Sequence, residues 1–320
     1  MRARPLSPDA PLVPLWVLAL AVAAHLGLKG VFFSVPFAVG VVFPIEMATG
    51  WAVTGATLAG LISWVVLVVA VIGVAGRLRP SHLGLSASGL AETGPVLLAV
   101  WLAVQVAGLA LSPGGAGPAV PPDASVALGR GLQAVFGSGL IEEVFYRGFL
   151  LTQIYAHLKG RIDVERALVA AVVSTSVYFG VSHVPAGVAM GLSGPDVAGY
   201  VVHCALVGTL FAGLFLRSGN LYLAVGAHAL LNEPVPLSAP AVDPALLTLI
   251  ALCLVVLAWP VLARQFPRHL SVGHLDGRPA LYDAPTGGRG RDGAARDRAV
   301  DPGPRGPREP HGAAWDSQAA

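Results

Sequence analysis

Long windows without a charged side chain dominate the pattern of hydrophobic and polar positions along the chain. Five windows of 20 or more residues lack Asp, Glu, Lys and Arg altogether: 47–76, 93–122, 167–195, 197–216 and 244–263. Each window is long enough for the roughly 20 apolar residues that a helix needs to cross a bilayer. A cleaved signal peptide explains at most the first apolar run, 11–28, and none of the later ones. The pattern therefore predicts an all-α membrane protein that crosses the bilayer several times.

Basic residues in short loops predict the orientation of these helices, because Lys and Arg concentrate on the cytoplasmic side of a membrane. They cluster at Arg2/Arg4, Arg77/Arg79, Lys159/Arg161/Arg166, Arg217 and Arg264/Arg268. Two spans fit between each successive pair of clusters, which predicts about eight transmembrane helices with both termini in the cytoplasm. The expected spans are 11–28, 52–75, 95–112, 126–157, 167–183, 199–216, 220–234 and 244–262. Lys29 is the exception, since it lies on the side that is otherwise nearly free of basic residues.

Three regions fall outside these spans. Residues 30–50 are apolar but contain two prolines and Glu46, so we expect an interfacial or re-entrant segment, the alternative being an extension of a span. Residues 264–320 are rich in Arg, Gly, Pro and Asp, a composition that cannot bury enough apolar surface to fold. We predict a cytoplasmic N-terminus at 1–10, a transmembrane domain at 11–263 and a disordered cytoplasmic tail at 264–320.

Composition supports the membrane assignment and excludes other classes. Hydrophobic residues make up 55% of the chain and charged residues only 12%, whereas soluble domains are about 25% charged. A soluble enzyme is therefore excluded. The formal net charge of +2 gives no basis for a nucleic-acid-binding surface. The two cysteines, Cys204 and Cys253, lie in apolar runs and do not form a disulfide framework.

Charged residues within the predicted span 126–157 form the first candidate site. An ionisable group costs roughly 2.5 to 3.5 kcal/mol at the centre of a membrane helix, so such groups usually mark a site or a pathway. Glu143 and Arg147 are four residues apart and share a helix face, where they can neutralise each other. Glu142 lies about 100° away around the helix and is left poorly paired, which suits a general base. The alternative is an ion cluster that only holds helices together.

Two further polar sets lie on later spans. His183 ends the span 167–183, where a lone histidine is often only a capping residue. His228 and Asn232 are four residues apart on the span 220–234, so both can donate hydrogen bonds toward one point. Two donors in a dry cavity suit an oxyanion, although an ordinary interhelical hydrogen bond is the alternative.

Taken together, these sets provide a carboxylate base, an imidazole and two hydrogen-bond donors on three helices. That combination is what the attack of water on a carbonyl group requires. Glu142, His183 and His228 equally match a three-ligand zinc site with an open position. The sequence does not separate a metal-free site from a Zn²⁺ site.

Other candidates are weaker. The GLSG sequence at 191–194 matches the GxSG pattern of rhomboid serine proteases, in which Ser193 would be the nucleophile and His228 the base. Ser193, however, lies in a loop rich in Pro and Gly. No HExxH motif, P-loop or dinucleotide fingerprint is present in the sequence. Three further histidines stand singly and are read as structural: His25, His82 and His203.

The order and spacing of the three polar sets resemble the CPBP family of intramembrane proteases, named for CAAX proteases and bacteriocin processing. The resemblance covers roughly residues 126–234 and rests on Glu142-Glu143-x-x-x-Arg147, Phe179-x-x-x-His183 and His228-x-x-x-Asn232. It implies an eight-helix fold around a buried catalytic cavity. In the branch of CAAX prenyl protease type 2, it further implies removal of the last three residues after a prenylated cysteine.

The resemblance also implies roles for individual residues. Glu142 and His183 would activate water, while His228 and Asn232 would stabilise the tetrahedral oxyanion. Glu143 and Arg147 would organise the site, or Glu143 would share the role of base. Members of the family have been described both as metalloproteases and as glutamate proteases without a metal, so both remain open.

We therefore expect a multi-pass cell-membrane endopeptidase with a peptide or membrane-anchored protein as substrate, the lipid bilayer as its environment and no nucleic-acid partner. The competing interpretation is a non-catalytic membrane protein, either a transporter-like bundle or an immunity scaffold. The substrate and the oligomeric state are not predicted.

Overall fold

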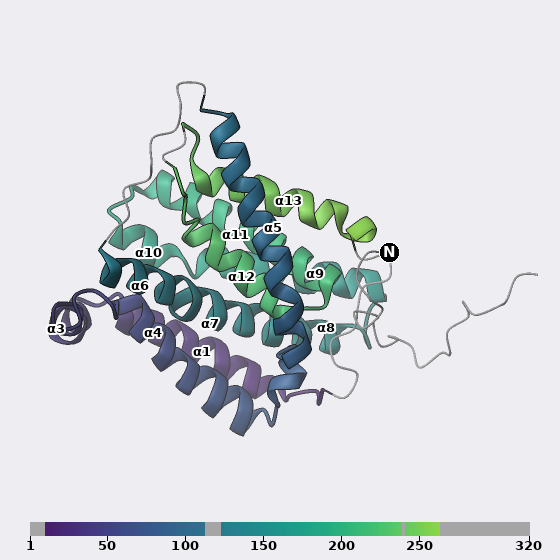
Figure 1. Ribbon diagram of the computed structural model, residues 1–320. Helices are drawn as coiled ribbons and strands as arrows, with labels where there is room; N and C mark the ends of the chain where they lie inside the picture. Colours follow the sequence, from purple (N-terminus) through teal and green to yellow (C-terminus); the bar gives the residue numbers. More distant parts are fainter. Residues whose placement is uncertain (1–9, 113–122, 239–240, 263–320) are drawn as a thin grey trace, which may run out of the picture. The chain divides into compact units, whose positions relative to one another are not determined.

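The computed structural model describes residues 10–112, 123–238 and 241–262 (Figure 1). All of them belong to the first of two units, Met1–Arg278 and Pro279–Ala320. The predicted tail at 264–320 and most of the predicted N-terminal segment at 1–10 lie outside the described residues. Every regular element in the described part is a helix, so the predicted all-α class is confirmed.

The helices follow one another through the described residues in this order: α1 (Leu15–Phe32), α2 (Val35–Phe37), η1 (Ala38–Val42), α3 (Phe43–Ala48), α4 (Gly55–Ser63), η2 (Trp64–Ala75), η3 (Pro80–Leu83), α5 (Ala87–Ala110), α6 (Ala124–Leu132), η4 (Gln133–Gly139), α7 (Leu140–Glu143), η5 (Val144–Leu151), α8 (Thr152–Leu158), α9 (Val164–Val181), α10 (Val184–Ala189), α11 (Gly194–Ser218), α12 (Leu221–Asn232) and α13 (Pro244–Leu262). The element η3 is a 3₁₀ turn. The other η elements are π-helical stretches that continue neighbouring α-helices.

Six helices of the described part are long and apolar enough to cross a membrane: Leu15–Phe32, Gly55–Ala75, Gly89–Ala110, Val164–Ala189, Gly194–Ser218 and Pro244–Leu262. A polytopic membrane protein is therefore confirmed, and the predicted count of eight is not. The predicted spans 126–157 and 220–234 are not among these six. The first is helical but carries a cluster of charged side chains, and the second corresponds to α12, which has only 12 residues, or about 18 Å.

The segment Val35–Ala48 is a short apolar helical stretch of α2, η1 and α3. Its 14 residues extend about 21 Å at the helical rise, less than the roughly 30 Å of a bilayer core. This length agrees with an interfacial or re-entrant segment better than with a span.

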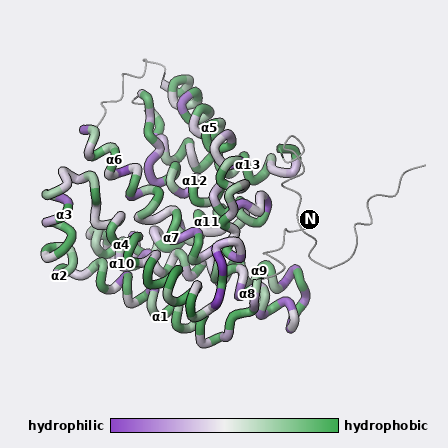
Figure 2. Tube along the Cα trace, turned by 60° about the horizontal axis from the view of Figure 1, so that its bottom comes forward, coloured by the Kyte–Doolittle hydropathy of each residue, from purple (hydrophilic) through white to green (hydrophobic). Residues whose placement is uncertain are grey.

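Outward-facing side chains of the long helices are apolar, as lipid contact requires. On α1, for example, Leu15, Trp16 and Leu20 are exposed, and hydrophobic colour continues along the outer helices in Figure 2. The few buried positions of α1 are Val17, Ala21 and His25, which recur every fourth residue. One face of α1 therefore contacts the interior of the bundle.

A continuous helical stretch at 124–158, formed by α6, η4, α7, η5 and α8, lies at the centre of the bundle. All eight residues of η5 are buried. Glycines let α4 approach this stretch backbone to backbone. A Cβ atom on Gly60 would lie 2.0 Å from the carbonyl oxygen of Phe136, and one on Gly137 would lie 2.8 Å from the carbonyl carbon of Ala56. This close contact fixes the position of the helix that carries the two adjacent glutamates.

Candidate active site

Glu143 and its partners form the fully buried part of the site. Glu143 is the last residue of α7 and is 0% exposed. Its Oε1 accepts a hydrogen bond of 2.9 Å from Nη1 of Arg147, as the four-residue spacing predicts. The same oxygen lies 2.8 Å from Nδ1 of His228 on α12, which donates to it. Glu143 therefore connects the central helix to α12.

Arg147 connects the central helix to α11. Its Nη2 donates a hydrogen bond of 2.7 Å to the backbone oxygen of Gly208. Its guanidinium carbon lies 4.7 Å from the ring centre of Phe179 and 5.5 Å from that of Phe211, which is cation–π geometry. The charge of Arg147 is therefore compensated by Glu143 and by aromatic faces rather than by water.

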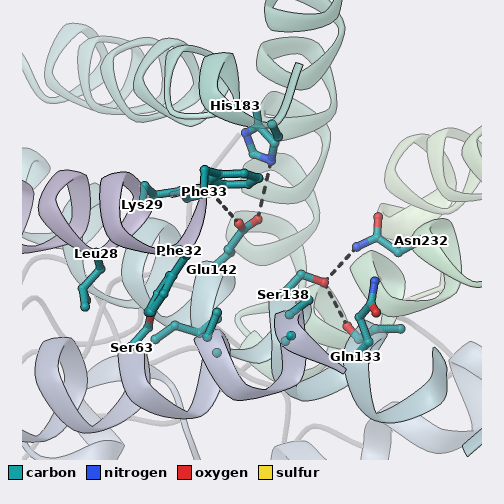
Figure 3. Close-up of a pocket in the computed structure, with 18 of the residues that line it drawn as sticks. Leu28, Lys29, Phe32, Phe33, Ser63, Gln133, Ser138, Glu142, His183 and Asn232 are labelled. Carbon is teal, nitrogen blue, oxygen red and sulfur yellow. Dashed lines mark hydrogen bonds and ion pairs between the residues drawn. The ribbon is translucent and has the colours of Figure 1, made fainter. Parts of the chain in front are cut away.

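Glu142 occupies the neighbouring position and faces a different set of partners (Figure 3). Its Oε1 accepts a hydrogen bond of 3.2 Å from Nζ of Lys29 on α1. Its Oε2 is buried and has no hydrogen-bond partner in the described residues. This oxygen lies 3.9 Å from Nε2 of His183 and 3.8 Å from Nε2 of His228. The three polar atoms therefore surround a point that a small polar group can occupy.

Backbone and carboxylate contacts orient both histidines. His183 lies between α9 and α10, and its Nδ1 donates to the backbone oxygen of Phe179 at 2.7 Å. Nδ1 of His228 donates to Glu143, as described above. Each imidazole thus uses Nδ1 for support and directs Nε2 toward Glu142.

Asn232 lies one helical turn after His228, at the end of α12. Its Nδ2 donates a hydrogen bond of 2.9 Å to the hydroxyl of Ser138 on η4 (Figure 3). A side-chain amide has two donor hydrogens, so one remains available for a ligand. The structure thus brings His183 and His228 each within 4 Å of Glu142. Asn232 lines the same two cavities and is held through Ser138.

Two cavities meet at these residues. Their volumes are about 600 and about 590 Å³. The two cavities share five lining residues: Ser138, Glu142, His183, Tyr200 and Asn232. The first cavity continues between α1, η1 and α4 along apolar side chains such as Phe32 and Phe37. The second continues between α9, α11, α12 and α13. A peptide that occupied both cavities would therefore pass beside Glu142.

The remaining sequence candidates have other partners. Nδ1 of His25 lies 2.8 Å from the hydroxyl of Tyr178, and Nδ1 of His82 accepts from the backbone of Arg79, so both have structural contacts. His203 lines the second cavity. Ser193 is exposed and its hydroxyl donates to Asp196, whereas the rhomboid interpretation requires a contact with His228.

Three site residues were not recognised from the sequence: Lys29, Ser138 and Tyr200. The signal for Lys29 was present, because it is the exception to the distribution of basic residues. The ring of Tyr200 packs edge-on against His183 with ring centres 6.1 Å apart. An ordinary Ser or Tyr within an apolar helix gives no comparable signal.

Two features of the structure oppose a zinc ion at Glu142, His183 and His228. Within the described ranges, no group of three or more His, Cys, Asp or Glu residues has the arrangement of a metal site. The ammonium group of Lys29 also contacts the carboxylate that would be a ligand, which opposes the binding of a second cation there. The zinc site at Glu142, His183 and His228 stays a prediction.

Comparison with known proteins identifies the part of the chain that carries the site. Residues 124–233 match the family model described as "Type II CAAX prenyl endopeptidase Rce1-like". No curated protein and no solved structure matches the chain. The matched segment contains all three polar motifs, whereas α1 and α13 lie outside it. Residues 124–233 are therefore similar to the Rce1-like family of type II CAAX endopeptidases, which is consistent with the intramembrane proteases that the motifs of this segment resemble.

Proposed function

We propose that this protein is an intramembrane endopeptidase that hydrolyses a peptide bond with water activated by Glu142 and His183. One observation carries the proposal. A buried carboxylate oxygen without a hydrogen-bond partner, Oε2 of Glu142, faces Nε2 atoms of two histidines at the junction of two cavities. The similarity of residues 124–233 to the Rce1-like family supports peptidase chemistry in general.

The proposed first step transfers one proton and forms one bond. A water molecule between Glu142 and His183 gives a proton to Oε2 of Glu142 while its oxygen bonds to the carbonyl carbon of the substrate. The carbonyl electron pair moves to its oxygen and produces a tetrahedral oxyanion. Collapse of this intermediate breaks the C–N bond, and Glu142 returns the proton to the leaving amine.

His228 and Asn232 are proposed to stabilise the oxyanion. Asn232 has a free amide hydrogen beyond its bond to Ser138. His228 donates through Nδ1 to Glu143, so it can donate through Nε2 only as an imidazolium. The carboxylate of Glu143 compensates that positive charge at 2.8 Å. Arg147 in turn holds Glu143, which assigns these two residues a supporting role.

The proposed substrate is a peptide or a membrane-anchored protein. The apolar lining of the first cavity and the outer helices suit a substrate that approaches from the lipid phase. We further propose a multi-pass cell-membrane location with cytoplasmic termini, which rests on the distribution of basic residues.

The decisive experiment is cleavage of a fluorogenic peptide library by detergent-purified protein, with Glu142→Gln as the test variant. Gln keeps shape and hydrogen bonding but cannot take up the proton, so cleavage should fall by about 10²- to 10⁴-fold in a protein that remains folded. The matched control is Glu165→Gln in the exposed first turn of α9, which should cleave normally.

Parallel arms separate the alternatives. Loss of activity with a chelator and recovery with zinc would replace the metal-free proposal by a metalloprotease. Loss of thermal stability in Glu142→Gln without any wild-type cleavage would favour a non-catalytic bundle. Cleavage by Glu142→Gln at the wild-type rate would refute Glu142 as the base.

A further inference from the structure

We propose that Lys29, which lies outside the family-matched segment, is a positioning residue that directs the carboxylate of Glu142 toward the reacting water. The proposal rests on the function proposed above and deepens it, because it assigns a role in the same site to the N-terminal helix. Its basis is the contact of Lys29 with one oxygen of Glu142 while the other oxygen is left free.

The geometry divides the two oxygens of Glu142 between two tasks. Nζ of Lys29 donates to Oε1 at 3.2 Å, and the two side chains are only 16% and 12% exposed. The terminal torsion of a glutamate is broad and roughly two-fold, so a free carboxylate would turn readily. The bond from Lys29 fixes that torsion and leaves Oε2 directed at the two histidines.

The charges around the site support the same role. Arg147 is committed to Glu143 and to the backbone of Gly208, at 2.9 and 2.7 Å. Among the ion pairs in the described part of the chain, Lys29 is the one Lys or Arg partner of Glu142. Lys29 thus pairs with Glu142 as Arg147 pairs with Glu143, and a charge buried in apolar surroundings without such a partner is costly.

The position of Lys29 on α1 explains how it reaches the site. The buried residues Val17, Ala21 and His25 recur every fourth position, and Lys29 continues that series by one more turn. Figure 3 shows Lys29 beside Phe33 at the wall of the first cavity, on the side of Glu142 that also holds His183. The same placement explains why Lys29 is the exception to the distribution of basic residues. A lysine is present on that side of the membrane because it contacts Glu142, and not because it determines the orientation of the helices.

The test compares Lys29→Ala with Lys159→Ala, the same substitution at the other lysine of the chain. Lys159 follows α8 and lies over the ring of Tyr155, away from both cavities. In Lys29→Ala we expect kcat to fall about 10- to 100-fold, because only part of the rate contribution of a positioned general base is lost. KM should stay within about threefold of the wild-type value. Lys159→Ala should have the kcat and the KM of the wild type.

Chemical rescue distinguishes positioning from a purely structural ion pair. Ethylammonium chloride should enter the space vacated in Lys29→Ala and restore part of kcat, whereas sodium chloride at the same concentration should not. Wild-type kcat in Lys29→Ala would overturn the proposal while leaving the proposed function intact. A loss that ethylammonium does not restore, together with a lower thermal midpoint, would also overturn it in favour of a structural role. Absence of cleavage by the wild-type protein would overturn the proposed function and this inference together.

Discussion

Replacement of Arg147 by methionine should destabilise the protein strongly, because it leaves a carboxylate buried without its cation. Arg147 is 2% exposed and Glu143 is 0% exposed. The variant removes the 2.9 Å bond to Glu143 and the 2.7 Å bond to the backbone of Gly208. Methionine fills much of the space of the arginine stem, so the loss reports charge and hydrogen bonding more than volume.

The magnitude follows from these contacts. Removal of one partner of a buried ion pair typically costs 3–5 kcal/mol. Polar interactions in membranes average only about 0.6 kcal/mol, since the unfolded chain in a membrane also finds partners. We therefore expect a loss of about 3 kcal/mol for Arg147→Met. The double variant with Glu143→Gln should lose about 1–2 kcal/mol less than Arg147→Met, because it no longer buries an uncompensated charge.

The assay is denaturation in mixed detergent micelles with increasing SDS, followed by circular dichroism for both single variants and the double variant. Arg166→Met, at an exposed position of α9, is the control and should stay within about 0.5 kcal/mol of wild type. The reasoning would be refuted by a loss below about 1 kcal/mol for Arg147→Met, or by a double variant whose loss equals the sum of the single losses.

Two further predictions concern packing and the serine alternative. Gly208→Ala should cost about 1–3 kcal/mol in the same denaturation assay, because its Cβ would lie 3.1 Å from Phe179 and 3.2 Å from Arg147. The control is Gly199→Ala on the same helix, whose Cβ would meet nothing within 4 Å and which should not destabilise the protein. Ser193→Ala should leave the rate of peptide cleavage within about twofold of wild type, because the hydroxyl is exposed and bonded to Asp196; a rate at background level would revive the rhomboid interpretation.

The fold class could be predicted because lipid contact leaves a strong signal in the sequence. Long apolar windows identified the six helices of the described residues that are both long and apolar enough to span. The number of spans was harder to predict from the sequence, because charged residues and short helices at a site interrupt the apolar pattern by which a span is recognised. The segments 126–157 and 220–234 carry two of the three polar motifs and do not qualify as spans, whereas His183 lies on Val164–Ala189, which does qualify.

The site could be predicted only in part. The spacing of Glu143 and Arg147 determines that they meet within one helix, and the structure contains this pair. Contacts between helices, such as His228 with Glu143, depend on packing that a single sequence does not encode locally. Lys29 is more than one hundred residues away from Glu142 along the chain, so their contact became visible only in the folded structure.

Two adjacent glutamates show how the fold assigns different tasks to identical side chains. Successive residues of a helix point about 100° apart, so Glu142 and Glu143 cannot share one environment. Glu143 faces Arg147 and His228 and has no exposure, which fits it to hold other groups in place. Glu142 faces Lys29 and the two cavities. Each glutamate has one oxygen without a hydrogen-bond partner, but only that of Glu142 lies at the cavities beside the Nε2 atoms of both histidines, which fits Glu142 to exchange a proton. In the proposed mechanism, a residue of the N-terminal helix acts on a site whose motifs all lie within residues 124–233, so we expect substrate processing to depend on how α1 packs.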